Sequence, residues 1–459
     1  MHCVSVWLLT LTVILSVSCR VGNATPKQND QRVVFYVFGS EDIYIVDPKS
    51  KAILSTIGPD GVCTKSNNRY SRDNCSFGRN TVVRDKLIFF SDMPGNRVHV
   101  IDAQEQKVVE TILTEGYPYD LYYLHWLKEV WVHSWTNSTF DVINTDGSLK
   151  KTHEAIKAHV QPGWTHGYMF ADPEVKDGKI GYITHLFNPG LHQIDLIAKA
   201  YKTFVNVSDY DCTGTLNFVY SPVNKHAFFD CFRSSTRVAL LEMSLTNDTI
   251  VRKWNISGVP YVSPDGRYIV ALYKSVNESM NLLLASKVYV LVIPGEDSAT
   301  ILKSTLDIAG GVSDLVYYEK VEKKGSFIAY VSLIYSDKIA VLDLDSIDSG
   351  NPQISYVENV GNVYSAPGMH SVRRPLAASG PWLVTPATAN QSLAIINIAT
   401  QELYGMVKGV VKGRGMAAYR EIAAYSTTPY PKGAGRSFCG SKAIVMFTLL
   451  YTLYMLMAG

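Results

Sequence analysis

The sequence predicts an all-β fold, a single closed β-propeller of eight four-stranded antiparallel blades. Similar hairpin segments recur along the chain, and apolar residues alternate with a period of two. Outside the two ends, no stretch longer than a few residues has a helical period. The composition agrees, because 28 Tyr, 32 Gly and 19 Pro among 459 residues are typical of many strands and turns.

The N-terminal element is an apolar run, residues 4–17, with the sequence VSVWLLTLTVILSV. This run is too short to span a bilayer comfortably and fits the core of a signal peptide. We therefore expect residues 1–24 to be a signal peptide that is cleaved between Ser18 and Ala24, and the protein to be secreted.

The repeat unit is a strand that ends in Asp or Asn, a turn, and a second strand. Four segments align at once, and they are 43–57, 98–112, 191–205 and 393–407. Looser copies occupy 140–154, 238–254, 288–306 and 339–357. From Ile43 to Leu393 seven intervals cover 350 residues, a mean of 50, which suits blades of four short strands. Seven blades, or an array of β-sandwiches, are the alternatives.

The first repeat lacks one strand, because only residues 33–38 precede its hairpin. The segment 413–425 follows the eighth hairpin and could supply that strand, which would close the ring and remove an open sheet edge. We therefore expect the propeller to span residues 33–425. The acidic residues that recur once per repeat are expected to cap turns rather than to bind a metal: Asp47, Asp102, Asp195 and Asp343.

The C-terminal element is an uncharged apolar stretch, residues 443–459, which follows the small residues Gly433-Ala434-Gly435 and a polar spacer. This order is the signal for a GPI anchor, whose apolar tail is removed on maturation. We expect Gly433 to carry the anchor, with Ser426 as the alternative, and residues 426–442 to form the anchor site and spacer. The protein would then lie on the extracellular face of the plasma membrane or be shed into the matrix. A tail-anchored or short single-span protein is the alternative.

Four of the seven cysteines lie outside the two ends that we expect to be removed. An even number of cysteines in a secreted chain predicts disulfides, here two, with three possible pairings. We prefer Cys63–Cys75 and Cys212–Cys231, because each pair closes a short local loop. Buried free thiols are the alternative, and a zinc site is disfavoured because no C-x-x-C motif occurs.

Eight N-x-[ST] sequons are spread along the chain, which is consistent with a glycoprotein processed in the endoplasmic reticulum. Asn23 falls within the expected signal peptide, and a disulfide at Cys75 would crowd Asn74. The six sequon residues that we expect to carry N-glycans are Asn137, Asn206, Asn247, Asn255, Asn277 and Asn390.

Charge and motifs exclude several classes of function. The 43 basic and 41 acidic residues give a net charge of +2, so there is no electrostatic case for nucleic acid. The chain contains no G-x-S-x-G elbow, no P-loop and no H-E-x-x-H motif. We therefore predict no catalytic residue, no metal site and no cofactor. Histidines that lie near Asp172 are expected to be ordinary loop residues, and they are His153, His159 and His166.

Two further groups have a candidate binding role and a simpler structural explanation. Tryptophans that could stack on sugar rings are expected instead to pack inside a blade, and they are Trp126, Trp131, Trp135 and Trp164. The pair Arg373-Arg374 and the basic segment 408–414 could meet acidic glycans. We expect both to be solvated loops.

Several segments resemble the C-terminal, YVTN-type propeller region of the long follistatin-like proteins. They are residues 75–112, 129–137, 259–272 and 310–317, and the placing of Cys212 and Cys231 is also similar. The likeness covers most of residues 33–420 and implies an extracellular propeller. The Kazal, EF-hand and immunoglobulin modules of those proteins have no counterpart in this sequence. Growth-factor capture and EF-hand calcium binding are therefore not implied.

Two functions remain from this reasoning. The first is a GPI-anchored extracellular glycoprotein that binds an extracellular protein or glycan through loops on one face of the ring. The alternative is a calcium-dependent propeller hydrolase of the lactonase type, with a calcium ion in the central channel.

Overall fold

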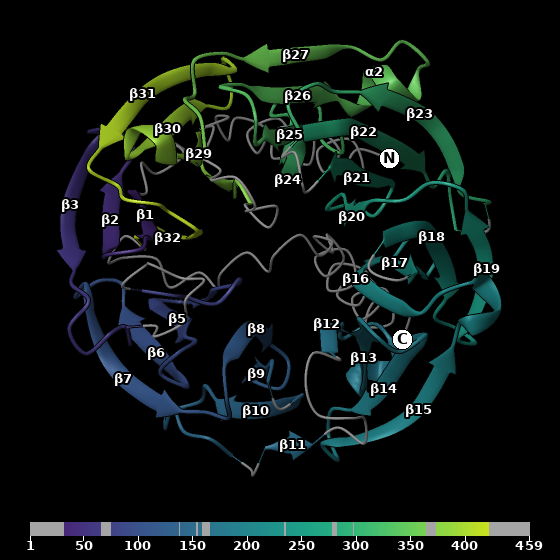
Figure 1. Cartoon of the computed structure of the whole chain (residues 1–459), viewed down its shortest axis with the longest axis horizontal. Helices are drawn as coiled ribbons and strands as arrows, with labels where there is room; N and C mark the ends of the chain where they lie inside the picture. The colour runs from purple at the N-terminus through teal and green to yellow at the C-terminus, as the bar shows by residue number, and fades with distance from the viewer. Residues whose placement is uncertain are drawn as a thin grey trace, which may run out of the picture.

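The computed structural model of the chain is an eight-bladed β-propeller, as the sequence predicts (Figure 1). It describes residues 32–65, 75–136, 138–152, 155–157, 166–233, 236–277, 282–296, 298–363 and 373–421. Eight four-stranded sheets surround one axis, and each sheet is antiparallel throughout. The expected signal peptide and the anchor sites Ser426 and Gly433 lie outside the described residues.

The blades follow one another in chain order, and each consists of four strands, named from the innermost outward. Blade 1 consists of β32 (Gly415–Arg420), β1 (Val33–Phe38), β2 (Ile43–Asp47) and β3 (Ala52–Ile57), and blade 2 of β4 (Val82–Arg84), β5 (Leu87–Asp92), β6 (Arg97–Asp102) and β7 (Lys107–Leu113). Blade 3 consists of β8 (Pro118–Leu124), β9 (Glu129–Ser134), β10 (Thr139–Asn144) and β11 (Ile156–Lys157), and blade 4 of β12 (His166–Ala171), β13 (Ile180–His185), β14 (Gly190–Asp195) and β15 (Ala200–Asn206). Blade 5 consists of β16 (Gly214–Ser221), β17 (His226–Arg233), β18 (Thr236–Ser244) and β19 (Thr249–Trp254), and blade 6 of β20 (Val259–Val262), β21 (Tyr268–Asn277), β22 (Leu282–Val292) and β23 (Ile301–Asp307). Blade 7 consists of β24 (Val312–Glu319), β25 (Phe327–Leu333), β26 (Ile339–Asp343) and β27 (Ile354–Val357), and blade 8 of β28 (Ala377–Ser379), β29 (Trp382–Ala387), β30 (Ser392–Asn397) and β31 (Glu402–Lys408).

Helical structure among the described residues is confined to four short segments: η1 (Lys176–Gly178), η2 (Ser208–Tyr210), α2 (Leu344–Asp348) and η3 (Thr388–Asn390). In this part of the chain no helix has the length and apolar character needed to cross a membrane.

The core is divided into eight apolar clusters, one between each pair of neighbouring blades. Strand β1 shows why its residues are apolar throughout. Val33, Phe35 and Val37 pack against blade 8, and the alternate residues Val34 and Tyr36 pack against blade 2. Successive side chains of a strand point to opposite faces, so a strand buried on both faces must be apolar at every position.

The ring is closed by pairing the two ends of the described chain. Strand β32 pairs with β1 over six residues, from Val33 opposite Arg420 to Phe38 opposite Gly415. The segment that the sequence predicts as the closing strand therefore supplies the innermost strand of blade 1, beside β1 (Figure 1). This pairing joins segments more than 370 residues apart in the chain.

The outer turns follow from a short sequence pattern. The carboxylates of Asp47, Asp102 and Asp195 each accept hydrogen bonds from the backbone N–H groups two and three residues later, at 2.8–3.4 Å. Asp343 caps the N-terminus of α2 in the same way, through the N–H of Asp345 at 3.1 Å. These four residues are turn and helix caps, as expected.

Because the innermost strands all run in the same direction, the ring has two distinct faces. We call the face where the innermost strands begin the loop face, and the face where they end the turn face. The described chain enters and leaves the ring on the turn face, where Arg32 and Glu421 form an ion pair at 3.7 Å and a backbone hydrogen bond at 2.9 Å.

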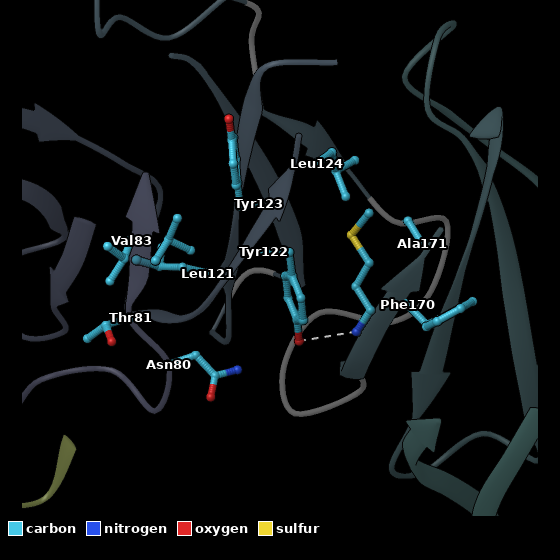
Figure 2. A pocket seen from close by; sticks show the side chains of 11 residues that line it. Asn80, Thr81, Val83, Leu121, Tyr122, Tyr123, Leu124, Phe170 and Ala171 are labelled. Carbon is cyan, nitrogen blue, oxygen red and sulfur yellow. Dashed lines mark hydrogen bonds between the residues drawn. The ribbon is translucent and has the colours of Figure 1, made fainter. Parts of the chain in front are cut away.

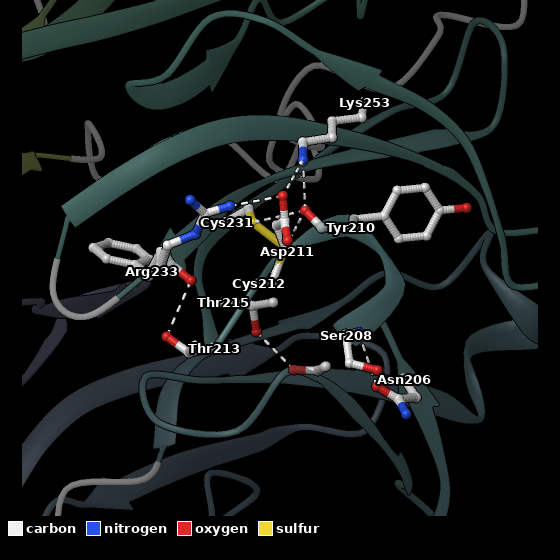
Figure 3. The surroundings of a disulfide bond; sticks show 12 residues. Asn206, Ser208, Tyr210, Asp211, Cys212, Thr213, Thr215, Cys231, Arg233 and Lys253 are labelled. Atoms are coloured by element: carbon white, nitrogen blue, oxygen red, sulfur yellow. Dashed lines mark hydrogen bonds and ion pairs between the residues drawn. A yellow bond between two sulfur atoms is a disulfide. The ribbon is translucent and has the colours of Figure 1, made fainter.

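Both preferred disulfides are present. Cys63 is bonded to Cys75 in the loop between β3 and β4, and Cys212 is bonded to Cys231 of β17. Figure 3 shows that the second disulfide lies beneath a polar network, in which Asp211 pairs with Arg233 at 2.6 Å and with Lys253 at 3.7 Å. Both bridges hold loops that join an outermost strand to the next innermost strand, on the loop face.

The expected glycosylation sites are unevenly placed between the two faces. Asn206, Asn255 and Asn390 are exposed on the loop face, and Asn277 ends β21 on the same face. Asn247 is exposed in the turn between β18 and β19, on the turn face. Asn137 lies outside the described residues, and glycan attachment at all six sites stays a prediction.

Ring closure makes the whole fold depend on β32. We expect a chain truncated after Lys412 to lose its cooperative unfolding transition, or to melt at a temperature lower by roughly 10 °C or more, because blade 1 loses a strand and its neighbours lose Ala417 and Tyr419. Differential scanning calorimetry would measure this against a control chain truncated after Glu421. An unchanged midpoint in the shorter chain would show that the last strand is dispensable.

Candidate functional site

Two aspartates occupy equivalent places on opposite sides of the ring. Asp120 is the third residue of β8 and Asp314 is the third residue of β24, and each is followed by a buried leucine. A shift in strand register occurs next to each of them. Blades 3 and 7 are four blades apart in a ring of eight, so the two residues lie on opposite sides of the axis, near the loop face.

Asp120 is fully buried and only partly satisfied. One carboxylate oxygen pairs with Arg79 at 2.9 Å and accepts a hydrogen bond from the hydroxyl of Tyr122 at 3.3 Å. The other oxygen has no hydrogen-bond partner among the described residues. Burial raises the pKa of Asp120, and the nearby charge of Arg79 opposes that rise.

Arg79 ties three successive blades together. It precedes β4 of blade 2, and its backbone N–H donates to the carbonyl of Tyr119 in blade 3 at 2.8 Å. Its guanidinium reaches Asp120 and also lies 3.6 Å from the ring centre of Tyr168 in blade 4, a cation–π contact. Only 16% of the Arg79 side chain is exposed, so its first role is structural.

Asp314 joins the three blades on the other side. Its carboxylate accepts hydrogen bonds from Tyr261 in blade 6 at 2.9 Å, from Arg373 at 2.8 Å, and from the backbone N–H of Leu376, just before blade 8, at 3.0 Å. Asp314 is buried, whereas 40% of the Arg373 side chain is exposed. Arg373 therefore presents a positive charge at the loop face.

The two groups influence each other electrostatically. Burial by itself would lower the pKa of Arg373. The nearby Asp314, Tyr261 and Asp120 outweigh this effect, so the pKa is raised above its usual value. Burial holds the pKa of Tyr261 well above its usual value, and the charges of Arg373 and Arg79 both lower it in part. We call these residues the axial cluster, and its members are Arg79, Asp120, Tyr168, Tyr261, Asp314 and Arg373.

The expectation of a solvated loop is confirmed for Arg373, which is exposed in the loop before β28, but it is wrong for Arg374. Arg374 is completely buried, and its guanidinium donates to the carbonyls of Leu333, Ser336 and Val360 at 2.9–3.2 Å. It also donates to the hydroxyl of Thr385 at 3.2 Å. Carbonyl oxygens at strand and loop ends replace the water that an exposed arginine would bind, and a basic dipeptide gives no sign of this in the sequence.

Another buried carboxylate lies in blade 5. Asp230 of β17 accepts hydrogen bonds from the amide of Asn217 at 2.5 Å and from the guanidinium of Arg237 at 3.0 Å. Its other oxygen has no partner among the described residues. Burial raises the pKa of Asp230 to about 6, although Arg237 and Asn217 partly offset the effect.

The tryptophans singled out from the sequence mostly pack within or between blades. Trp131 is fully buried in blade 3, as expected. Trp126 packs against the cluster between blades 3 and 4, and its indole N–H donates to the carbonyl of Gly178 at 3.0 Å. Trp135 is half-buried, and its ring lies 4.5 Å from that of Tyr119 near the axial cluster. Trp164 lies outside the described residues.

The histidines and basic residues singled out from the sequence have different outcomes. His166 is the first residue of β12, so the expectation that it lies in a loop is wrong. Asp172, near it in sequence, caps a turn through the N–H of Glu174, at 2.8 Å. The side chains that are exposed, as expected, are Lys408, Lys412 and Arg414. His153 and His159 lie outside the described residues.

No set of three or more His, Cys, Asp or Glu side chains in the described ranges is placed to hold a metal ion. The axial cluster itself was not found from the sequence. The signal that could have revealed it is the Asp-Leu pair that begins an inner strand in PYDLYYL (118–124) and VSDLVYYE (312–319), four repeats apart.

No protein-family model matches the chain. Among solved structures it is similar to the dihydro-heme d1 dehydrogenase NirN in complex with DHE, at 12% identity and a TM-score of 0.57, over 84% of this chain and 74% of that one. It is also similar to apo AztD from Citrobacter koseri, at 12% identity and a TM-score of 0.54, over 85% of this chain and 98% of that one. At these identities the likeness shows the fold alone.

The raised pKa of Asp230 gives a test of its burial. The folded state holds this proton more tightly than the unfolded chain, whose Asp pKa is about 3.9, so the stabilisation present near pH 4 is lost as the pH rises through about 6. Relative to Asp230→Asn, the free energy of unfolding of the wild type should therefore fall by up to ~3 kcal/mol between pH 4 and pH 7. Urea titrations at several pH values would measure it.

Asp146→Asn is the control for this experiment, because Asp146 pairs with Lys128 on the surface and its pKa is lowered instead. Its difference from the wild type should change with pH in the opposite direction. A pH-independent difference for Asp230→Asn would contradict the assignment.

Proposed function

We propose that this protein is a GPI-anchored extracellular glycoprotein that binds an extracellular protein or glycan through the loop face of its propeller. The observation that carries the proposal is the axial cluster, in which a half-exposed arginine and two tyrosines gather where the innermost strands begin. Arginine and tyrosine are enriched at binding hot spots, because each combines a large contact area with hydrogen-bonding groups. The resemblance to the follistatin-like propellers agrees with an extracellular location.

The placement of the chain ends supports this orientation. The described chain leaves the ring at Glu421 on the turn face, twelve positions before Gly433. A lipid at Gly433 would therefore attach on the turn-face side of the ring, which favours an orientation with the loop face and the axial cluster pointing outward. The two disulfides brace loops on that outward face.

Binding is a better match to the axial cluster than catalysis. A calcium-dependent hydrolase, the alternative, needs carboxylates whose oxygens converge on one ion. Asp120 and Asp314 are instead each paired with an arginine at 2.8–2.9 Å. Their carboxylates support the neighbouring blades, and the cation of Arg373 is the charge that a partner would meet first.

The anchor can be tested on cells that express the full chain. We expect phosphatidylinositol-specific phospholipase C to release the protein into the medium, because a GPI anchor is its only proposed attachment to the membrane. Flow cytometry with an antibody against the propeller would measure the loss of surface signal. If the protein stays on the cells and keeps its C-terminal peptide by mass spectrometry, the anchor proposal is wrong.

Binding at the axial cluster can be tested with a charge-removing substitution. We expect Arg373→Gln to reduce the neighbours recovered by surface proximity labelling at least fivefold, because it removes the exposed cation while glutamine can still donate to Asp314. Arg267→Gln is the matched control, since Arg267 is 41% exposed and paired with an aspartate, but lies on the turn face. Equal labelling by both variants would place the partner elsewhere.

A further inference from the structure

A pocket of about 430 Å³ lies beside the axial cluster, against the innermost strands of blades 2, 3 and 4. Its walls begin one residue beyond the axial cluster on two strands. Asn80 follows Arg79, and Leu121 follows Asp120. Tyr122 links the two sites, because its hydroxyl donates to Asp120 and accepts a hydrogen bond from the backbone N–H of Met169 at 3.1 Å. Figure 2 shows the second of these bonds within the pocket.

The lining of this pocket is mixed, with polar and apolar groups in about equal share. The side chains of Val83, Leu121, Leu124, Met169 and Ala171 contribute aliphatic groups from three different strands. A volume of this size falls in the range of roughly 300–1,000 Å³ that is typical of small-molecule sites, which are lined by apolar groups with a few placed polar ones.

The polar groups of the pocket are neutral. They are the Asn80 amide and the hydroxyls of Thr81, Tyr122 and Tyr123, and no Asp, Glu, Lys, Arg or His side chain belongs to the lining. Within the part of the chain that the structure describes, the Asn80 amide and the Tyr123 hydroxyl make no hydrogen bond. In Figure 2 they lie toward opposite ends of the lining, so the pocket offers a donor or acceptor at each end.

The absence of charge in this lining decides the class of ligand. A charged ligand would give up its hydration without meeting an opposite charge, which is costly. Beside the pocket, the charges of Arg79 and Asp120 are already paired with each other at 2.9 Å. An uncharged molecule with an apolar skeleton loses little hydration and gains contact with three strands.

We propose that this pocket binds an uncharged amphipathic small molecule, whose skeleton packs on Val83, Leu121 and Met169 and whose hydroxyl or carbonyl groups bond to Asn80 and Tyr123. The inference rests on the proposed function only in treating the ring as a binding module. Binding in the pocket requires neither the lipid anchor nor the partner at the axial cluster.

The test uses the purified full chain and the neutral dye Nile red. We expect saturable binding of about one dye per chain with a blue shift in emission, and at least tenfold weaker binding of the anionic dye 1-anilinonaphthalene-8-sulfonate. Val83→Trp should weaken Nile red binding at least tenfold, because the indole would fill the pocket from a position that is 36% exposed and tolerant of a larger side chain. Ala171→Phe, from the opposite wall, should act in the same direction.

Val109→Trp is the matched control. It makes the same substitution in the same blade at a residue that is 41% exposed, but on the outermost strand β7, and it should leave Nile red binding within twofold of the wild type. Thermal midpoints of the three variants would identify any that fails to fold. Absent or non-saturable Nile red binding, equal binding by Val83→Trp, or tighter binding of the anionic dye would overturn the proposal. If Nile red fails to bind while Arg373→Gln still reduces labelling, the pocket inference alone is wrong.

Discussion

Each blade of this protein can bury its two faces only against its neighbours, and the rest of the structure depends on that constraint. The core is a set of eight separate clusters between blades, so removing any blade would expose two of them. The ring must therefore close, and it closes by backbone pairing of β1 with β32 across nearly the full length of the described chain. Loop-closure entropy opposes this long-range pairing. Burial of Tyr36 on β1 and Tyr419 on β32, both in the cluster between blades 1 and 2, offsets the cost.

The same constraint gives a structural role to buried charges that contact several blades. Near the loop face, side chains that bridge three blades supply contacts in addition to apolar packing. Asp120 with Arg79 and Asp314 with Arg373 form two such bridges on opposite sides of the axis. Breaking a buried ion pair typically costs about 3–5 kcal/mol, so the buried Asp120–Arg79 pair stabilises the geometry that it occupies. The arginines of the two bridges differ in exposure, and this difference separates the structural Arg79 from Arg373, which can meet a partner.

The pocket beside the axial cluster has a related origin. Innermost strands leave one sheet edge facing the axis, and Tyr122 satisfies the edge N–H of Met169 that would otherwise lack a partner. Leu121, Leu124 and Met169 line the open pocket next to this tyrosine, and the same residues belong to the clusters between blades 2, 3 and 4. A ring built to bury apolar faces thus provides a neutral pocket beside a charged cluster, and the two can recognise different chemistries.

The sequence alone determined the features that depend on local chemistry. Period-two alternation, the turn caps at Asp47 and Asp102, the short loops closed by the four cysteines and the missing strand of the first repeat were enough to predict the blades, the disulfides and the closing segment. Only the tertiary structure placed Asp120 and Asp314 on opposite sides of the ring, buried Arg374 among carbonyls and brought residues of three blades together around the pocket. These features join residues from different blades, and which residues meet at the axis depends on the number of blades and the closure of the ring, which no single repeat contains.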